Sequence, residues 1–243
     1  MDKIPVVTKN LIAINILMAV ASYVLAERFG IDLKDYLGLH FFMSENFMPH
    51  QLVTYMFMHG GLSHVFFNMF ALFMFGRTLE TVWGAKRFII YYLVAGVGAA
   101  LVQEAVGAAR FFPLAAGIPP SEAAMVVEEG YAILQQHMNY ADPVLAAFNN
   151  VLNLPTVGAS GAVYAILLGF GMLFPNDRIF IFPLPVPIKA KYFVIGYALI
   201  EFFLGTVGSP DGVAHFAHLG GMLFGFILII YWRKKRKIDG PYV

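Results

Sequence analysis

Residues 213–232 read VAHFAHLGGMLFGFILIIYW, and this stretch decides the fold class. Its length equals the roughly 20 residues that an α-helix needs to cross about 30 Å of hydrocarbon at about 1.5 Å per residue. Two histidines, His215 and His218, and two spaced glycines, Gly221 and Gly225, lie within the apolar run. Because ionisable groups are costly inside a bilayer, the segment predicts a membrane helix that also carries chemistry.

The composition of the whole chain also indicates a membrane protein. Of its 243 residues, 59% are hydrophobic and 13% are charged, a balance far from that of soluble globular domains. Residues 19–21 (Ala-Val-Ala) fit a cleavable signal peptide, but the further apolar stretches favour a first membrane span. The sequence therefore predicts an all-α, polytopic membrane protein that forms one domain over residues 1–243. Its six expected transmembrane helices cover residues 11–26, 62–76, 88–102, 156–174, 192–207 and 213–232.

The basic residues predict the orientation in the membrane. With both termini cytosolic, the outer side receives only Arg28, Lys34 and Arg110, and the positive-inside rule favours this arrangement. We therefore expect an integral, multi-pass protein with both termini in the cytosol, and we expect the bacterial inner (plasma) membrane. The basic residues on the expected inner side are Lys3, Lys9, Arg77, Lys86, Arg87, Arg178, Lys189, Lys191 and those of the tail 233–237.

Two expected outer segments are long, at residues 29–61 and 108–155. The second is an insert between the third and fourth spans, and its Pro119-Pro120-Ser121 begins a helical pattern. This helix either rests on the lipid surface or helps to admit a substrate. Its expected apolar face consists of Val127, Tyr131, Leu134 and Met138.

The composition excludes several kinds of chemistry. The basic residues do not gather in one stripe, so nucleic acid is not an expected partner. The chain has no cysteine, which excludes thiol nucleophiles, disulfides and thiolate metal sites. All aspartates lie outside the expected spans or at their ends, which argues against an aspartyl protease. The pairs His59/His64 and His215/His218 lack a carboxylate partner in their motifs, so we expect no metal site.

The remaining candidates for chemistry lie at one expected depth. Counting about 1.5 Å per residue from the inner boundary puts His64 at about 20 Å, Ser160 at about 22 Å and His218 at about 21 Å. Asn68 shares a helix face with His64, and Tyr164 shares one with Ser160. Each residue also has a structural interpretation, because a serine at a helix start is often only a cap and a membrane histidine often only joins helices.

Small residues predict close contact between the fourth and sixth spans, although such stripes often serve packing alone. Close approach would bring Ser160 within reach of a histidine. His218 lies nearer than His215 to the glycine face and to the depth of Ser160, so a ring nitrogen of His218 is predicted within about 3.5 Å of the Ser160 hydroxyl. The small residues are Gly161, Ala165 and Gly169 on the fourth span and Gly221 and Gly225 on the sixth.

Three motifs resemble those of the rhomboid family. Gly158-Ala159-Ser160-Gly161 is similar to G-x-S-G, and residues 217–225 are similar to A-H-x-x-G-x-x-x-G. Residues 59–68 resemble H-x4-H-x3-N. These motifs occur in the family's order and are more specific together than G-x-S-G alone. Further matches are Glu80, Trp83-Gly84 and Arg87-Phe88.

The resemblance implies a six-helix rhomboid-like bundle and an intramembrane serine endopeptidase without a cofactor. Ser160 would be the nucleophile and His218 its general base and later acid, as a dyad without a carboxylate. Tyr164 would stack on the His218 ring, and His64 and Asn68 would hold the oxyanion. The implied partners are single-span or polytopic membrane protein substrates within the lipid bilayer.

Other functions fit parts of the sequence. A catalytically inactive rhomboid-like protein that binds membrane clients is the alternative, although Ser160 and His218 are both present. A small transporter would need charges at mid-bilayer, which only Glu104 and Glu201 approach, and an internal repeat. Glu201 could also be a third catalytic member, but it lies on another helix and matches no family motif. The Trp-Arg pair that many rhomboids carry in the first outer loop does not occur in residues 29–61.

Overall fold

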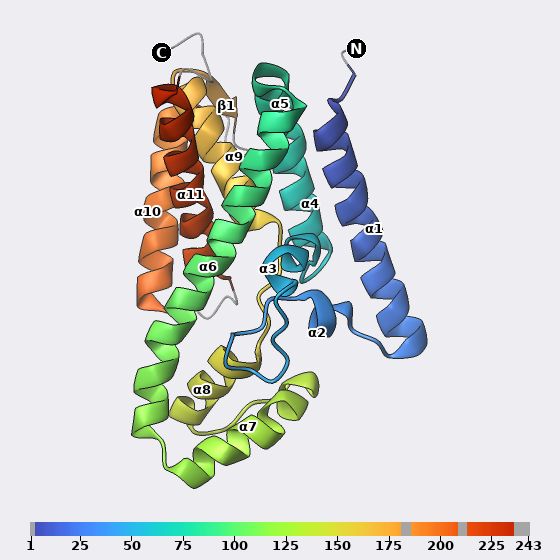
Figure 1. The fold of residues 1–243 in the computed structure, drawn as a ribbon, viewed down its shortest axis with the longest axis vertical. Coiled ribbons are helices and arrows are strands. Elements are labelled where there is room, and N and C mark those ends of the chain that lie inside the picture. The colour runs from blue at the N-terminus through green and yellow to red at the C-terminus, as the bar shows by residue number, and fades with distance from the viewer. Residues whose placement is uncertain (1–2, 181–185, 209–212, 236–243) are drawn as a thin grey trace.

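The computed structural model describes residues 3–180, 186–208 and 213–235. Arg236 and Lys237 of the expected basic tail lie outside these ranges. Figure 1 shows a bundle in which the start of α1 and the end of α11 lie at the same end of the molecule. The bundle consists of α1 (Val6–Phe29), α4 (Leu62–Ala71) with the π-helical turn η2 (Leu72–Gly76) and α5 (Arg77–Trp83), α6 (Ala85–Gly117), α9 (Ser160–Leu173), α10 (Ala190–Val207) and α11 (His215–Lys234).

Five of these helical segments are long and apolar enough to cross a membrane, and the all-α fold is confirmed. The fourth expected span, at residues 156–174, is shorter than the sequence predicted, because its helix α9 covers only Ser160–Leu173. At about 1.5 Å per residue, its 14 residues extend about 21 Å, less than the roughly 30 Å of hydrocarbon. The chain before Ser160 is therefore extended at a depth where the sequence predicted helix.

Helix α9 packs against α11, α6 and α10, and α6 and α11 also pack directly on each other. A Cβ atom added to Gly221 of α11 would lie only 1.9 Å from the Gly161 carbonyl oxygen of α9. The predicted contact between these helices is therefore present, with backbone against backbone. Gly169 does not share in it, because a Cβ there would meet Leu79 and Trp83 of α5. The Gly161 end of α9 thus fixes the position of α11.

The N-terminal helix is attached to the bundle by a buried carboxylate. Glu80 of α5 accepts hydrogen bonds from the backbone N–H groups of Val7 and Thr8 at 2.9 and 2.7 Å, and from the Thr8 hydroxyl at 2.7 Å. The first N–H groups of a helix lack intrahelical partners, so an acceptor at this place stabilises the start of α1.

The outer segment forms a second compartment at the opposite end of the bundle (Figure 1). Helix α6 continues to Gly117, so the beginning of the expected 108–155 insert is helical rather than a loop. The outer compartment has a small hydrophobic core of its own, which includes Phe111, Val126 and Phe148. The remaining helices here are α2 (Leu33–Leu37), α3 (Gln51–Thr54), η1 (Tyr55–Phe57), α7 (Pro120–Gln135) and α8 (Pro143–Asn153).

The expected helix of the insert forms, but its buried face is not the predicted one. Helix α7 buries Val126 and Gly130 against α8, whereas Val127 is 44% exposed and Met138 lies beyond the helix end. The cause is the partner α8, whose Asn149 donates to the Gly130 carbonyl oxygen at 3.2 Å. The helix therefore packs on α8 along the face of Val126 and Gly130.

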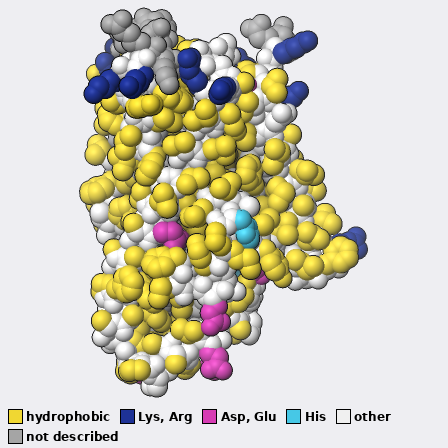
Figure 2. All heavy atoms as spheres, viewed as in Figure 1, with side chains coloured by type: hydrophobic (Ala, Val, Ile, Leu, Met, Phe, Trp, Pro, Cys, Tyr) yellow, Lys and Arg dark blue, Asp and Glu magenta, His cyan; other side chains and the backbone are white. Residues whose placement is uncertain are grey.

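The surface separates charge from apolar side chains. Figure 2 shows Lys and Arg side chains gathered at the end where α1 begins and α11 ends, above a broad hydrophobic band. A broad exposed apolar surface such as this band marks contact with lipid, which agrees with an integral membrane protein. At the basic end, two short antiparallel strands, β1 (Arg178–Phe180) and β2 (Pro187–Lys189), pair Arg178 with Lys189.

Candidate active site

An extended stretch before α9 delivers Ser160 to the site. Thr156 pairs with Leu39 through two backbone hydrogen bonds of 2.8 and 2.9 Å, and the Gly158 N–H donates to the Tyr55 carbonyl oxygen at 3.0 Å. Gly158 has φ +133°, and a Cβ there would lie 2.8 Å from the His64 ring, so glycine is required. The stretch therefore reaches Ser160 in one defined conformation.

Ser160 is the first residue of α9 but does not cap it. The N-cap position is Ala159, and no side-chain cap is formed there. Instead the Ser160 Oγ lies 2.7 Å from Nε2 of His218. This distance agrees with the predicted limit of about 3.5 Å. The catalytic roles of the two residues stay predictions.

The His218 ring is held from one side by an aromatic face. Tyr164, one turn after Ser160 on α9, stacks on it with ring centroids 4.2 Å apart and an interplanar angle of 7°. His218 is 7% exposed, and the contact between Gly221 and Gly161 fixes its helix one turn away. A ring stacked in this way keeps one orientation relative to Ser160.

Helix α4 presents two polar groups to the same cavity. The buried Asn68 Nδ2 has no hydrogen-bond partner among the described residues, which is unusual for a buried amide. The Gly60 N–H lies 3.3 Å from His64 Nδ1, so a neutral His64 that accepts this bond carries its proton on Nε2. His64 and Asn68 therefore both have N–H groups free to bind an oxygen atom.

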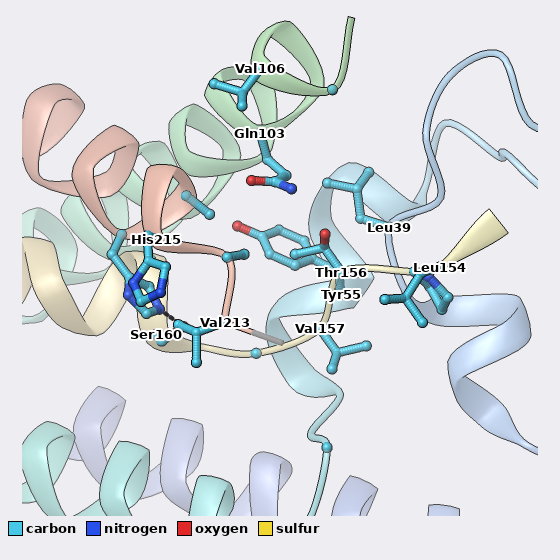
Figure 3. Close-up of a pocket in the computed structure, with 18 of the residues that line it drawn as sticks. Leu39, Tyr55, Gln103, Val106, Leu154, Thr156, Val157, Ser160, Val213 and His215 are labelled. Carbon is cyan, nitrogen blue, oxygen red and sulfur yellow. Dashed lines mark hydrogen bonds between the residues drawn. The ribbon is translucent and has the colours of Figure 1, made fainter. Parts of the chain in front are cut away.

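The cavity has a volume of about 840 Å³, and its wall contains His64, Asn68, Ser160 and His218. Figure 3 shows Ser160 and His215 together on one side of the cavity, with Leu39 and Leu154 on the other. The wall also includes Arg110 and Asn150, which belong to the 108–155 insert. The outer compartment thus completes a partly polar cavity at the depth of Ser160.

A carboxylate lies beside the predicted pair Ser160 and His218, where the sequence predicted none. Glu201 of α10, only 5% exposed, places its Oε2 2.9 Å from Nδ1 of His218 and 2.7 Å from Nδ1 of His215. Its Oε1 accepts a hydrogen bond from the Tyr164 hydroxyl. The sequence signal was a single glutamate within an apolar helix, but sequence alone could not show which partners it meets.

The same geometry corrects the argument against a metal site. The pair His215/His218 has no carboxylate in its own motif, yet Glu201 of α10 supplies one. One ligand atom from each of the three residues lies within 4.8 Å of the others, and this donor set suits a divalent cation such as zinc. The existing hydrogen bonds already satisfy the carboxylate, so the cluster is also complete without a cation.

A family model described as "Rhomboid domain" matches residues 46–235. Rhomboid protein 1, mitochondrial, of Saccharomyces cerevisiae is 26% identical over 178 residues, which are 70% of this chain and 38% of that protein. RHOMBOID-like protein 12, mitochondrial, of Arabidopsis thaliana is 28% identical over 211 residues, which are 81% of this chain and 52% of that protein. Rhomboid protease AarA of Providencia stuartii is 25% identical over 180 residues, which are 72% of this chain and 53% of that protein.

The chain spans 38% to 53% of the lengths of these three relatives. Two of them are named as mitochondrial, so the comparison does not support the expected bacterial inner membrane. The family match covers most of the chain and includes every residue of the cluster around Ser160. Therefore this chain belongs to the rhomboid family.

Proposed function

We propose that this chain is an intramembrane serine endopeptidase that hydrolyses peptide bonds in transmembrane substrates. The observation that carries the proposal is the 2.7 Å contact between Ser160 Oγ and His218 Nε2, which lies in a cavity of the membrane bundle. A hydroxyl is a weak nucleophile unless a base accepts its proton, and an imidazole nitrogen at this distance is suited to that role.

In the proposed reaction, the Ser160 oxygen attacks the substrate carbonyl carbon while its proton passes to His218 Nε2. The carbonyl π electrons move to the oxygen, and His218 then gives the proton to the amide nitrogen as the C–N bond breaks. Water attacks the acyl carbon next and transfers a proton to His218. The Ser160 oxygen leaves with that proton, so both residues return to their first state.

The negative oxygen of this intermediate needs donors that are already in place. We assign this role to His64 and Asn68, since Asn68 Nδ2 is buried without a partner among the described residues and both side chains line the cavity beside Ser160. Removing one such donor typically lowers kcat by about 10² to 10³.

The proposed substrates are single-span or polytopic membrane proteins. A peptide bond within a membrane helix is covered by its own hydrogen bonds, so a segment must unwind before Ser160 can reach it. The polar side chains of Gln103, Glu104 and Arg110 in the cavity wall can pair with the backbone groups that unwinding releases.

The test compares wild type with Ser160→Ala in liposomes that contain a panel of single-span substrates. We expect wild type to cut inside the transmembrane segment of at least one substrate and Ser160→Ala to cut none, with mass spectrometry locating the cut. A fluorophosphonate should label wild type and not Ser160→Ala. Equal cleavage or equal labelling in both proteins would overturn the proposal. A wild type that cuts nothing but retains membrane clients in both forms would favour the inactive, client-binding alternative.

A further inference from the structure

The Glu201 carboxylate joins three helices at the site. It extends from α10 and meets Tyr164 of α9 through Oε1 and both His215 and His218 of α11 through Oε2. A buried carboxylate in a bilayer is costly unless donors surround it, and these three donors provide that environment. A role in holding the helices together would explain the cluster, but it would not require that one of the donors be the ring that contacts Ser160.

The position of the carboxylate selects one tautomer of His218. A neutral imidazole carries one proton, and a carboxylate 2.9 Å from Nδ1 favours that proton on Nδ1. Nε2 is then an unprotonated acceptor, and this is the atom 2.7 Å from the Ser160 hydroxyl. The other tautomer places hydrogen on Nε2 and cannot accept the Ser160 proton. Glu201 therefore favours the form of His218 that can act as a base.

We infer that Glu201 is a positioning residue that extends the pair Ser160 and His218 to a Ser-His-Glu triad. This inference rests on the proposed function. When the Ser160 proton reaches Nε2, the ring becomes positive, and the carboxylate at Nδ1 stabilises that charge without accepting the proton. The proton transfers between Ser160, His218, the leaving amide nitrogen and water are the same as in the proposed reaction.

The other two contacts hold the carboxylate itself. His215 shares Oε2 with His218, and the Tyr164 hydroxyl binds Oε1, so both oxygens are fixed. Tyr164 therefore holds His218 in two ways: its ring stacks on the imidazole, and its hydroxyl fixes the Glu201 carboxylate that bonds to Nδ1. Tyr164→Phe keeps the ring and removes only the hydroxyl, so it separates these two effects.

The first test measures the tautomer directly. The ¹⁵N NMR signals of the His218 ring, assigned with His218→Gln, should show the proton on Nδ1 in wild type. In Glu201→Gln the amide has the same shape, but its NH₂ group donates toward Nδ1, so the proton should move to Nε2. A wild-type His218 with its proton on Nε2 would overturn the inference. Since this measurement needs no cleavage, its outcome is separate from that of the Ser160→Ala experiment.

The second test measures turnover. Glu201→Gln should lower kcat roughly 10³- to 10⁴-fold, as expected when a base is held in the wrong tautomer, with little change in KM. Tyr164→Phe should lower kcat about 10-fold, because Glu201 keeps its contact with His218 but loses one anchor. A Glu201→Gln protein that cleaves at the wild-type rate would contradict the inference.

Glu80→Gln is the matched control. Glu80 is as deeply buried as Glu201 but bonds to the start of α1, so this variant should lower Tm while it leaves kcat and the His218 tautomer unchanged. EDTA treatment distinguishes the metal interpretation of the cluster. Retained cleavage after EDTA supports the triad, whereas activity that EDTA removes and zinc restores would overturn it in favour of a metal centre.

Discussion

The contact between Gly221 and Gly161 leads to a quantitative prediction for Gly221→Ala. The new Cβ would lie 1.9 Å from the Gly161 carbonyl oxygen, and real Cβ atoms essentially never approach within 3.0 Å. The two backbones must therefore separate by about 1 Å or more, and errors of about 1 Å in a catalytic geometry can cost about 10² in rate. A separation of that size would stretch the 2.7 Å contact of Ser160 with His218 beyond hydrogen-bond range. We expect kcat to fall about 10²-fold and overpacking to cost about 1–3 kcal/mol of stability.

The assay for Gly221→Ala combines cleavage in liposomes with thermal unfolding in detergent. Gly196→Ala on α10 is the control, because a Cβ there has no neighbour within 4 Å and should change neither kcat nor Tm. Gly225→Ala is the second comparison: its Cβ would lie 2.9 Å from Ala165, one turn farther from Ser160. It should lower Tm with a smaller loss of kcat. Wild-type kcat and Tm in Gly221→Ala would refute the reasoning.

Three further variants test other parts of the structure. Asn68→Ala should lower kcat about 10²- to 10³-fold with little change in Tm, because Asn68 Nδ2 has no partner in the described part of the chain before an oxyanion forms; an unchanged kcat with a lower Tm would make Asn68 structural. Thr8→Val, which removes the hydroxyl bond to Glu80, should lower the unfolding free energy by about 1–3 kcal/mol and leave cleavage unchanged. Phe148→Ala should destabilise the outer compartment by about 3–5 kcal/mol, seen as faster proteolysis of α7 and α8, and equal proteolysis would contradict its place in that core.

That Ser160 and His218 lie at one level could be predicted because helix geometry is local. The rise per residue from the inner boundaries puts both residues at the same height, and their 2.7 Å contact agrees with this. The contact then depended on Gly161 and Gly221, since only residues without a side chain allow two membrane helices to approach so closely. Both features depend on residue type and spacing, which the sequence contains.

The ends and faces of several elements could not be predicted, because they depend on distant partners. Hydropathy does not distinguish the extended stretch before Ser160 from helix, and that stretch is fixed by its pairing with Leu39. The buried face of α7 differs by one residue from the apolar pattern, since Asn149 of α8 draws Gly130 inward. In each case a contact between segments far apart in sequence decides a local conformation.

Glu201 shows why a motif alone gives an incomplete site. The i,i+3 spacing of His215 and His218 places them only about 60° apart around α11, so one carboxylate can reach both rings. Nothing in that spacing says that the carboxylate comes from α10. The family motifs contain the serine and the histidine, so transferring them yields a dyad and leaves the charge of Glu201 unexplained. A buried charge must have partners, and its partners here include the His218 ring that contacts Ser160. The carboxylate therefore belongs in any account of how His218 acts, and a chain of this family with glutamine at this position should differ in the tautomer of its base even where every motif residue is the same.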